Sequence, residues 1–293
     1  MKRIKYFVIV ALVVALSSVL IYSVTKKEVH LGSSMYVPAE VSFAGEKAPL
    51  EVYDVKERFE RELLVNANLH SSTILIIKRA NRAFPVIEPI LKEYNVPDDF
   101  KYLAVIESAL TNAVSSAGAR GFWQFMESTA KESGMEVTPT VDERYHLVKS
   151  THAACKYLLK AKEKFGSWTL AAASYNAGMN GIASQMESQK ADNYYDLLLN
   201  EETSRYVFRI HALKQIMENP QNFGFAINKE DLYQLLPTKK VEVDSTITNL
   251  ADFAKTQGIN YKILKLHNPW LRDKKLPNPT KKMYVIEIPT SGY

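Results

Sequence analysis

Apolar residues recur every three or four positions through most of residues 50–220, which is the spacing of amphipathic helices. Two prolines, Pro85 and Pro89, fall inside the first apolar stretch. We expect them to end or kink a helix, because proline has no N–H to donate. The pattern therefore predicts an almost wholly α-helical region, with helices over 52–91, 101–110, 148–165, 168–176 and 204–218.

The pattern changes beyond residue 220. Proline, glycine and lysine in a polar setting over 223–239 predict a linker. The following segments predict a strand, two short helices ended by Gly258 and Pro269, and a closing strand, over 241–245, 247–258, 261–269 and 283–289. The fold class that we expect is mainly α, with a small α+β domain of βααβ order at the C-terminal end.

Residues 6–24 are an uncharged, mostly apolar run of about the length that spans a bilayer, and Lys2, Arg3 and Lys5 precede it. No small-x-small cleavage site follows, and the sole cysteine, Cys155, is too far away to carry a lipid. We favour a retained anchor over an export signal, with its basic end in the cytoplasm. The rest of the chain would then lie on the periplasmic face of the inner membrane, and the protein would not be a lipoprotein.

The composition narrows the chemistry. Hydrophobic residues make up 46% of the 293 residues, enough for a substantial core, and the formal net charge of +5 is spread too thinly for a nucleic-acid surface. One cysteine allows no intramolecular disulfide, and the histidines lack the HExxH spacing of a zinc site. No phosphate-binding glycine loop is present either. We therefore expect no metal, no cofactor and no nucleic-acid partner.

One carboxylate interrupts an apolar helix face. Leu103, Glu107, Leu110 and Val114 share this face on helical spacing. Burial disfavours the charged form of a carboxylate and raises its pKa, and an acid that is protonated near neutral pH can serve as a general acid. The alternative is a structural glutamate paired with a nearby arginine such as Arg120.

Three later stretches contain groups suited to holding a sugar. In 115–126, Gly118 and Gly121 allow a close backbone approach, and aromatic residues with one amide follow them. SYNAG at 174–178 ends an alanine-rich helix, and ETSRYVFRI at 202–210 places a tyrosine on another helix. Taken singly, these stretches are explained as a turn, a helix end and a core aromatic.

Taken in order, the motifs resemble those of the soluble-type lytic transglycosylases, relatives of goose-type lysozyme. That family has Glu-Ser, then a glycine-punctuated stretch ending in Gln and Met, then Tyr-Asn-Ala-Gly, then Glu-Thr-x-x-Tyr. Here the motifs stand at 107–108, 118–126, 175–178 and 202–206. The resemblance covers about residues 85–220 and implies a lysozyme-like α-helical catalytic domain. The lead-in from Val52 is similar to that of the membrane-bound subgroup called type D.

The resemblance implies that the chain cleaves the β-1,4 bond between MurNAc and GlcNAc of peptidoglycan. Glu107 would protonate the leaving oxygen and then act as base on the C6 hydroxyl of the same MurNAc, which closes a 1,6-anhydro ring. Two acids after the aromatic stretch, Glu127 and Glu132, are better explained as a solvated helix face. The substrate-binding residues that the resemblance implies are Ser108, Ser115, Gln124, Phe125, Met126, Tyr175, Asn176 and Tyr206, of which Tyr206 would orient the acid.

The C-terminal βααβ unit resembles a LysM module, a small domain that binds N-acetylglucosamine in glycans. The glycine usually found before its Asp-Thr pair is absent, so a packing domain without glycan affinity remains open. We thus expect a membrane anchor or signal, a helical lead-in, a lysozyme-like lytic transglycosylase domain, a linker and a LysM-like domain, over 1–25, 26–84, 85–222, 223–239 and 240–293.

Two other functions remain open. One is a hydrolytic muramidase on the same fold, in which water attacks in place of the C6 hydroxyl. The other is a non-catalytic peptidoglycan-binding protein that keeps the groove, which would have little need of an acid on an apolar face. Under all three functions the partners are peptidoglycan glycan strands and, through the N-terminal segment, the inner membrane.

Overall fold

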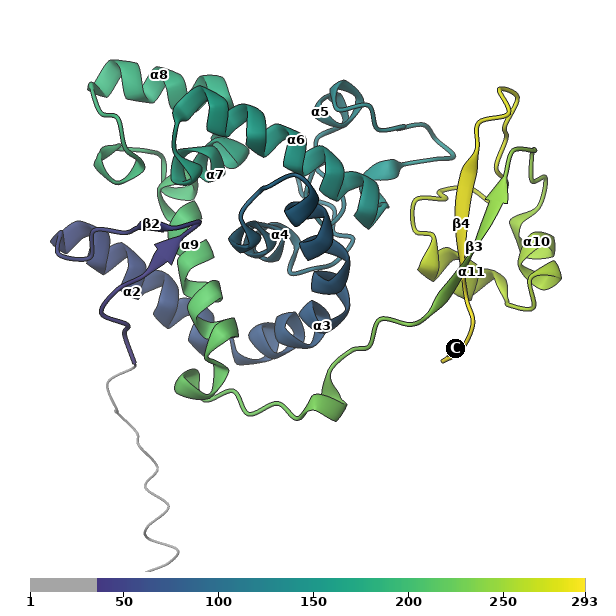
Figure 1. Cartoon of the computed structure of the whole chain (residues 1–293), viewed down its shortest axis with the longest axis horizontal. Helices are drawn as coiled ribbons and strands as arrows, with labels where there is room; N and C mark the ends of the chain where they lie inside the picture. Colours follow the sequence, from purple (N-terminus) through teal and green to yellow (C-terminus); the bar gives the residue numbers. More distant parts are fainter. Residues whose placement is uncertain (1–35, 293) are drawn as a thin grey trace, which may run out of the picture. The chain divides into compact units, whose positions relative to one another are not determined.

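The computed structural model describes residues 36–292 of the chain. The region 50–220 is mainly helical (Figure 1), but less completely than predicted, because turns and isolated bridges make up most of residues 109–146. The apolar pattern alone does not reveal α5 and α8, because these short helices bury one side chain each, Ala130 and Ile182. The helices of this region are α2 (Tyr53–Asn68), α3 (His70–Glu93), α4 (Lys101–Ser108), α5 (Glu127–Glu132), α6 (Leu147–Phe165), α7 (Trp168–Ala177), α8 (Met179–Gln189) and α9 (Glu201–Glu218).

Helix α3 runs through both of its prolines, so neither of them ends it. The single helix expected over 52–91 is instead two helices, which are divided at Leu69. Each proline removes one N–H donor and costs a helix interior ~3 kcal/mol. The helix buries apolar side chains on both sides of the prolines, among them Ala80, Ile87 and Leu91. Tertiary packing of this kind, more than local propensity, keeps a helix intact in a folded protein.

Helix α9 packs against α2, α4 and α7. Its buried side chains point in several directions, because Tyr206, Val207, Phe208 and Ile210 are all inaccessible to solvent or nearly so. A helix that is apolar on more than one side lies inside the body of a protein. This central position lets α9 present Tyr206 to α4, which carries Glu107.

A short antiparallel hairpin precedes the helices, formed by β1 (Ser42–Phe43) and β2 (Glu46–Lys47). Phe43 is fully buried, and its ring centroid lies 4.8 Å from that of Phe100 in an edge-on arrangement. The hairpin is therefore part of the helical body and not a free connection to the N-terminal segment.

The hairpin also caps a helix of the body. The Glu46 carboxylate accepts hydrogen bonds from the backbone N–H groups of Trp168 at 2.7 Å and Thr169 at 2.9 Å, and from the Ser167 hydroxyl at 2.8 Å. These N–H groups are the first ones of α7 and have no partner within the helix. A carboxylate at this end also interacts favourably with the helix dipole.

Residues 238–289 form the expected βααβ unit, which confirms the α+β part of the fold class. Val241 lies opposite Ile286 in its antiparallel strand pair. The side chains of Asn249 and Asn260 accept backbone hydrogen bonds at the starts of the two helices, as good N-caps do. The elements are β3 (Thr238–Val243), α10 (Leu250–Thr256), α11 (Tyr261–His267) and β4 (Tyr284–Pro289).

The apolar core of this C-terminal unit includes two residues from the loop before α6, Val141 and Tyr145. In the same loop the backbone N–H of Asp142 donates to the Trp270 carbonyl at 2.9 Å. The C-terminal unit thus completes its core with residues from the helical region.

The predicted linker contacts α3. Phe225 is buried and stacks on His70, with ring centroids 5.0 Å apart. The backbone N–H of Tyr233 donates to the Lys78 carbonyl at 3.1 Å, and the Lys78 ammonium lies 5.0 Å from the centre of the Tyr233 ring. These contacts hold the segment against the helical body, while the domain boundaries stay a prediction.

Within residues 36–292, no helix is long and apolar enough to cross a membrane. The predicted anchor at 1–25 lies outside the residues that the structure describes.

Candidate active site

Glu107 lies in the last turn of α4, which ends at Ser108, two residues before its predicted end. Ala109 and Leu110 follow with left-handed backbones, at φ of 51° and 56°. This conformation costs a non-glycine residue about 1–2 kcal/mol. The Arg79 guanidinium donates to the Ala109 carbonyl at 3.2 Å and helps to hold the turn. Strain that the surrounding structure enforces in this way is typical of functional sites.

The apolar face around Glu107 is present as predicted, because Leu103 and Leu110 are 0% and 1% exposed. Val114 lies beyond the end of the helix and is exposed. Glu107 itself keeps partial access to solvent, which a group that must reach a substrate requires.

The hydroxyl of Tyr206 donates a hydrogen bond to Oε1 of Glu107. Burial raises the pKa of Glu107 from its ordinary value of 4.5 to about 7. The bond from Tyr206 and the positive charge of Arg209 act against this rise, and the negative charge of Glu202 adds to it. A carboxyl group with a pKa of about 7 holds a proton in a large fraction of molecules at neutral pH.

The alternative explanation, an ion pair with Arg120, is wrong. Nη1 of Arg120 lies 3.6 Å from Oδ2 of Asp142. No ion pair to Glu107 occurs among residues 36–292. The acid therefore lacks the partner that would keep it charged.

The glycine and aromatic stretch forms a tight turn in which Arg120 and Phe125 exchange backbone hydrogen bonds of 3.1 and 3.2 Å. A Cβ atom at Gly121 would overlap the backbone carbonyl of Arg144, so only glycine fits there. The Gln124 backbone is left-handed at φ 49°, and its side-chain amide donates to the Gly121 carbonyl at 2.7 Å. Gln124 therefore braces the turn with its NH₂ group.

Two predicted site serines bond to nearby backbone. The Ser108 hydroxyl donates to the Ala104 carbonyl at 3.2 Å, and the Ser115 hydroxyl accepts from the Ala119 N–H at 3.0 Å. The first stabilises the helix that carries the acid, and the second closes the start of the turn.

Tyr175 on α7 joins the aromatic turn to the acid. Its hydroxyl donates to the Trp123 carbonyl at 2.8 Å, and its ring stands edge-on to Phe125 at 6.0 Å between centroids. Burial raises its pKa well above the usual range, and the charge of Glu107 contributes to that rise. Trp123 is fully buried, so it supports the turn from the core side.

Asn176 connects α7 to the start of α9. Its NH₂ group donates to the Glu202 carboxylate at 2.9 Å, and its carbonyl accepts from the Thr203 hydroxyl at 2.8 Å. Both groups of the amide are thus used in setting the two helices side by side.

The structure brings Tyr206 into direct contact with Glu107, and Tyr175 is close enough for their charges to interact. The other predicted residues make no hydrogen bond to Glu107 within the described part of the chain. One of them, Met126, lies on the surface with 43% exposure. Substrate binding by these residues stays a prediction.

Two groups near the acid have no role in the sequence-based prediction, although Glu202 begins the motif at 202–206. Glu202 and Arg209 both act electrostatically on Glu107. Their spacing relative to Tyr206, four residues before and three after, places all three on one side of a helix. From the sequence, this spacing predicts that Glu202, Tyr206 and Arg209 lie on the same side of a helix. It does not predict that this side of α9 faces α4.

The pair of Asp142 and Arg144 was also missed. Both side chains are 2–3% exposed, and two hydrogen bonds of 2.9 and 2.8 Å join them. Nη1 of Arg144 also donates to the Phe125 carbonyl at 3.4 Å, so this pair anchors the aromatic turn.

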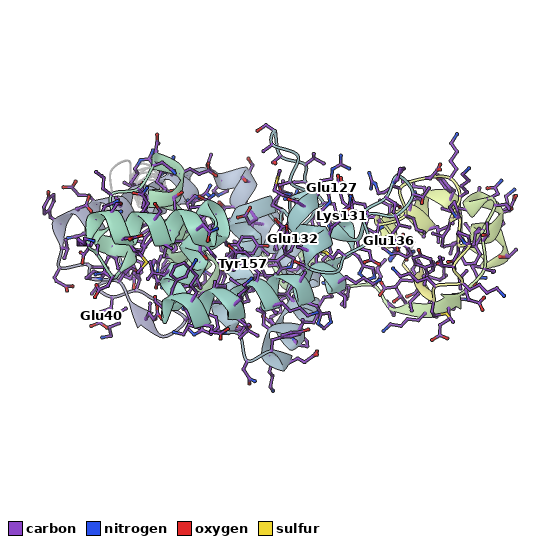
Figure 2. All side chains as sticks on the ribbon, turned by 90° about the horizontal axis from the view of Figure 1, so that it is seen from above. Glu40, Glu127, Lys131, Glu132, Glu136 and Tyr157 are labelled. Carbon is purple, nitrogen blue, oxygen red and sulfur yellow. The ribbon has the colours of Figure 1, made fainter. Side chains whose placement is uncertain are left out.

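The acids that follow the turn lie on the solvent side, as predicted. Glu127 and Glu132 are exposed on α5 together with Lys131, whose ammonium lies 2.6 Å from the Glu127 carboxylate (Figure 2). Surface pairs of this kind contribute little and are poor candidates for catalysis.

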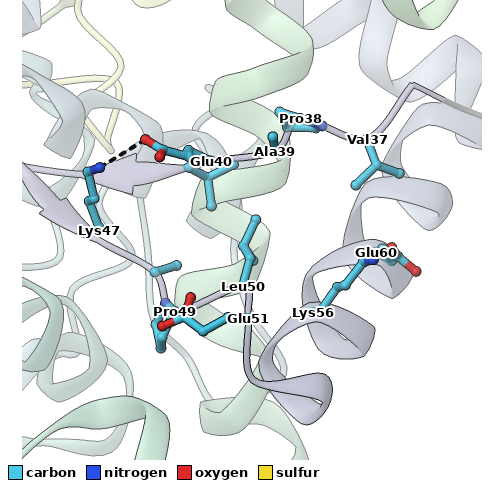
Figure 3. A pocket seen from close by; sticks show the side chains of 12 residues that line it. Val37, Pro38, Ala39, Glu40, Lys47, Pro49, Leu50, Glu51, Lys56 and Glu60 are labelled. Atoms are coloured by element: carbon cyan, nitrogen blue, oxygen red, sulfur yellow. Dashed lines mark hydrogen bonds and ion pairs between the residues drawn. The ribbon is translucent and has the colours of Figure 1, made fainter.

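A separate hollow of about 700 Å³ lies between the segment 37–51 and the first turns of α2 (Figure 3). Its charged lining residues include Glu40 and Lys47, which pair with each other at 2.9 Å, and Lys56 and Glu60, which lie 3.8 Å apart. Neither Glu107 nor any residue of the sugar-binding motifs lines it. Within residues 36–292, no three His, Cys, Asp or Glu side chains are grouped to hold a metal ion.

Comparison with known proteins identifies two domains. Residues 84–198 match the family model of the transglycosylase SLT domain, and residues 239–292 match that of the soluble lytic transglycosylase C-terminal LysM-like domain. The first match ends before α9, which carries Tyr206, and the second covers the βααβ unit.

Curated relatives agree with these matches. The membrane-bound lytic murein transglycosylase D of Escherichia coli (strain K12) is 29% identical over 228 residues, which is 76% of this chain and 49% of that protein. The enzyme of the same name from Escherichia coli O6:H1 gives the same values. A putative tributyltin chloride resistance protein of Alteromonas sp. (strain M-1) is 26% identical over 167 residues, 54% of this chain and 81% of that protein. The chain spans about half the length of the first two relatives.

Proposed function

We propose that this chain, which carries an SLT transglycosylase domain followed by a LysM-like domain, is a peptidoglycan lytic transglycosylase. It cleaves the β-1,4 bond between MurNAc and GlcNAc and leaves a 1,6-anhydroMurNAc end. The two E. coli relatives, named as lytic murein transglycosylases, support this substrate.

The observation that carries the proposal is the state of Glu107. Its pKa of about 7 and its hydrogen bond from Tyr206 supply a positioned carboxylic acid that holds its proton in a large fraction of molecules at neutral pH. Such a group transfers its proton to the glycosidic oxygen as the bond to C1 of MurNAc breaks. The resulting carboxylate then removes the proton of the C6 hydroxyl while that oxygen bonds to C1. One residue thus acts first as acid and then as base, and it regains its proton at the end.

Tyr206 has a positioning role in this scheme. As long as its hydroxyl points at Oε1, the proton of the carboxylic acid is directed to the other oxygen. We propose that Ser108, Ser115, Gln124, Phe125, Met126, Tyr175 and Asn176 line the groove around the acid.

The test is mass analysis of the sugars that the purified chain releases from peptidoglycan, with Glu107→Gln as control. Muropeptides one water lighter than hydrolysis products, absent with the control, are expected. Ordinary reducing ends would identify a muramidase instead. Binding without release by the parent chain would identify a binding protein.

One observation keeps the muramidase as a second candidate. A hydrolase with inversion uses a second carboxylate to activate water, and Glu202 is an acid whose charge interacts with Glu107. The Glu202 carboxylate already accepts a hydrogen bond from the Asn176 amide. This bond favours a role in holding α7 and α9 together over that of a base that activates water. Product mass distinguishes the two reactions.

We further propose that the enzyme works in the cell envelope, anchored by residues 1–25 with its domains on the periplasmic face of the inner membrane. The positively charged residues before the apolar run support this orientation. We propose that the LysM-like domain binds the same glycan strands, which a pull-down with purified peptidoglycan tests by comparing the full chain with variants that carry substitutions on the surface of this domain.

A further inference from the structure

Arg209 lies one turn after Tyr206 on α9, and its guanidinium carbon is 5.6 Å from the centre of the Tyr206 ring. Its positive charge also acts on Glu107. Arg209 is therefore a cation next to the proposed catalytic acid.

This arginine differs from its neighbour in having no carboxylate partner among residues 36–292. Arg205, one turn earlier on the same helix, bonds to Glu62 at 2.6 Å and to Glu201 at 3.2 Å. In contrast, Nε of Arg209 is buried and has no hydrogen-bond partner within the described residues. Because Nε is inaccessible to solvent, a ligand would bind the terminal N–H groups of the guanidinium, which no ion pair occupies within the described residues.

The side chain borders an open hollow of about 300 Å³ that Glu201, Glu202, Arg205 and Arg209 line. Both acids of this lining are already bound, Glu201 by Arg205 and Glu202 by the Asn176 amide. The positive charge of Arg205 offsets that of Glu201, so a second anion in the hollow would meet the remaining charge of Glu202 alone. Of the two arginines that line the hollow, Arg209 is the one that remains able to bind an anion.

We propose that Arg209 binds a carboxylate of the peptide stem attached to the glycan strand at the cleavage site. This inference rests on the proposed function, since it takes the strand in the groove to be peptidoglycan. The sugars offer hydroxyl and acetamido groups, and the free carboxylates of the strand belong to its stems. The N–H groups of an arginine form a planar fork that matches the two oxygens of a carboxylate. Arg209 would thus make the enzyme prefer strands that still carry their peptides.

The experiment compares two substrates with the full chain: strands whose stems carry free carboxylates, and the same strands with these carboxylates converted to amides. Removal of the stems is unsuitable, because it would leave the lactyl carboxylate of each MurNAc free. We expect Arg209→Gln to lower the ratio of kcat/KM for the two substrates about tenfold, the size of a lost charge-assisted hydrogen bond. Arg209→Lys should recover part of the preference. Arg205→Gln, whose arginine already has its carboxylates, is the matched control and should leave the ratio at the parent value.

A ratio that stays constant while both rates fall in Arg209→Gln would overturn the proposal and assign Arg209 to the fold or to Glu107. If the parent cleaves neither substrate, the proposed function fails, and binding then decides the inference. A soluble disaccharide peptide should bind Glu107→Gln more tightly than the double variant with Arg209→Gln, whereas the same compound with its peptide carboxylates converted to amides should bind both alike. Equal affinity of the peptide-bearing sugar for both variants would refute a stem site at Arg209.

Discussion

Two partly buried glutamates of the helical region, Glu46 and Glu107, have pKa values that shift in opposite directions. Burial alone raises the pKa of Glu46, but hydrogen bonds from Thr169, Trp168 and Ser167 outweigh it and hold the pKa below the ordinary value of 4.5. Glu107 receives one such bond, from Tyr206, and burial prevails.

The number of donors that face a carboxylate therefore decides its role here. The site at the start of α7 offers unpaired backbone N–H groups, and a carboxylate there stabilises the fold as an anion. The site at the end of α4 offers apolar neighbours and one hydroxyl, so the group keeps a proton that it can give to a substrate. The first glutamate stabilises a helix, and the second is unfavourable in its charged state.

The largest expected effect is on activity and comes from a substitution of Glu107. Glu107→Gln removes the transferable proton and should lower kcat by ~10²–10⁴-fold, because general acid catalysis contributes that much. Release of muropeptides measures it. Activity within a few fold of the parent would show that another group protonates the leaving oxygen.

The next largest effect on activity is expected from a substitution of Tyr206, whose hydroxyl donates the hydrogen bond to Glu107. Tyr206→Phe should lower kcat by about 10–100-fold, the size of a lost hydrogen bond to a charged group. It should also move the alkaline limb of the pH profile upward from about 7, because this bond lowers the pKa of Glu107. A limb that moves downward would contradict the role assigned to Tyr206.

A substitution of Glu46, at the start of α7, is expected to change the stability of the fold. Glu46→Gln should lower the free energy of unfolding by about 1–3 kcal/mol, because the cap of α7 loses its charge. Denaturant unfolding at pH 7 measures it. The stabilisation by Glu46 is present above pH 4.5 and is lost as the pH falls through its lower folded value. The parent and the variant should therefore become similar in acid.

Glu107→Gln should have the opposite effect on stability. Since the folded pKa of Glu107 is raised, its cost to the fold is absent below pH 4.5 and complete above about 7. The variant should unfold at a higher temperature than the parent at pH 8 and at a similar one at pH 4. A lower temperature at pH 8 would indicate that the charged acid stabilises the fold.

The smallest effect is expected on the exposed side of α5. Lys131→Ala breaks the surface pair with Glu127 and should change neither the unfolding temperature nor the product yield measurably. A clear loss of activity would mean that this side of the helix contacts the strand.

The sequence predicts those features that depend on neighbours along the chain. Glu107 was identified because residues four before and three after it are apolar, and the βααβ order of 240–293 followed from alternation and caps. The same local logic failed at Pro85, because packing along α3 outweighs a missing N–H.

Contacts between distant segments could not be predicted in this way. Glu46 meets Thr169 across 123 residues, and Tyr206 meets Glu107 across 99. The sequence predicts that Gly121 lets the backbone approach a ligand, but in the folded chain it is the Arg144 carbonyl that lies against this glycine. Periodicity specifies the face of a helix but not what lies against it.

The central claim is that sparse hydrogen bonding at the end of α4 keeps Glu107 protonated near neutral pH. An NMR titration of the chain with ¹³C-labelled glutamate carboxyl groups, assigned by comparison with Glu107→Gln, tests it most directly. We predict one carboxyl signal that titrates with a pKa of about 7 and is missing in the variant. A Glu107 signal that titrates at or below 4.5 would contradict the account, because the acid would then be charged when it must donate its proton.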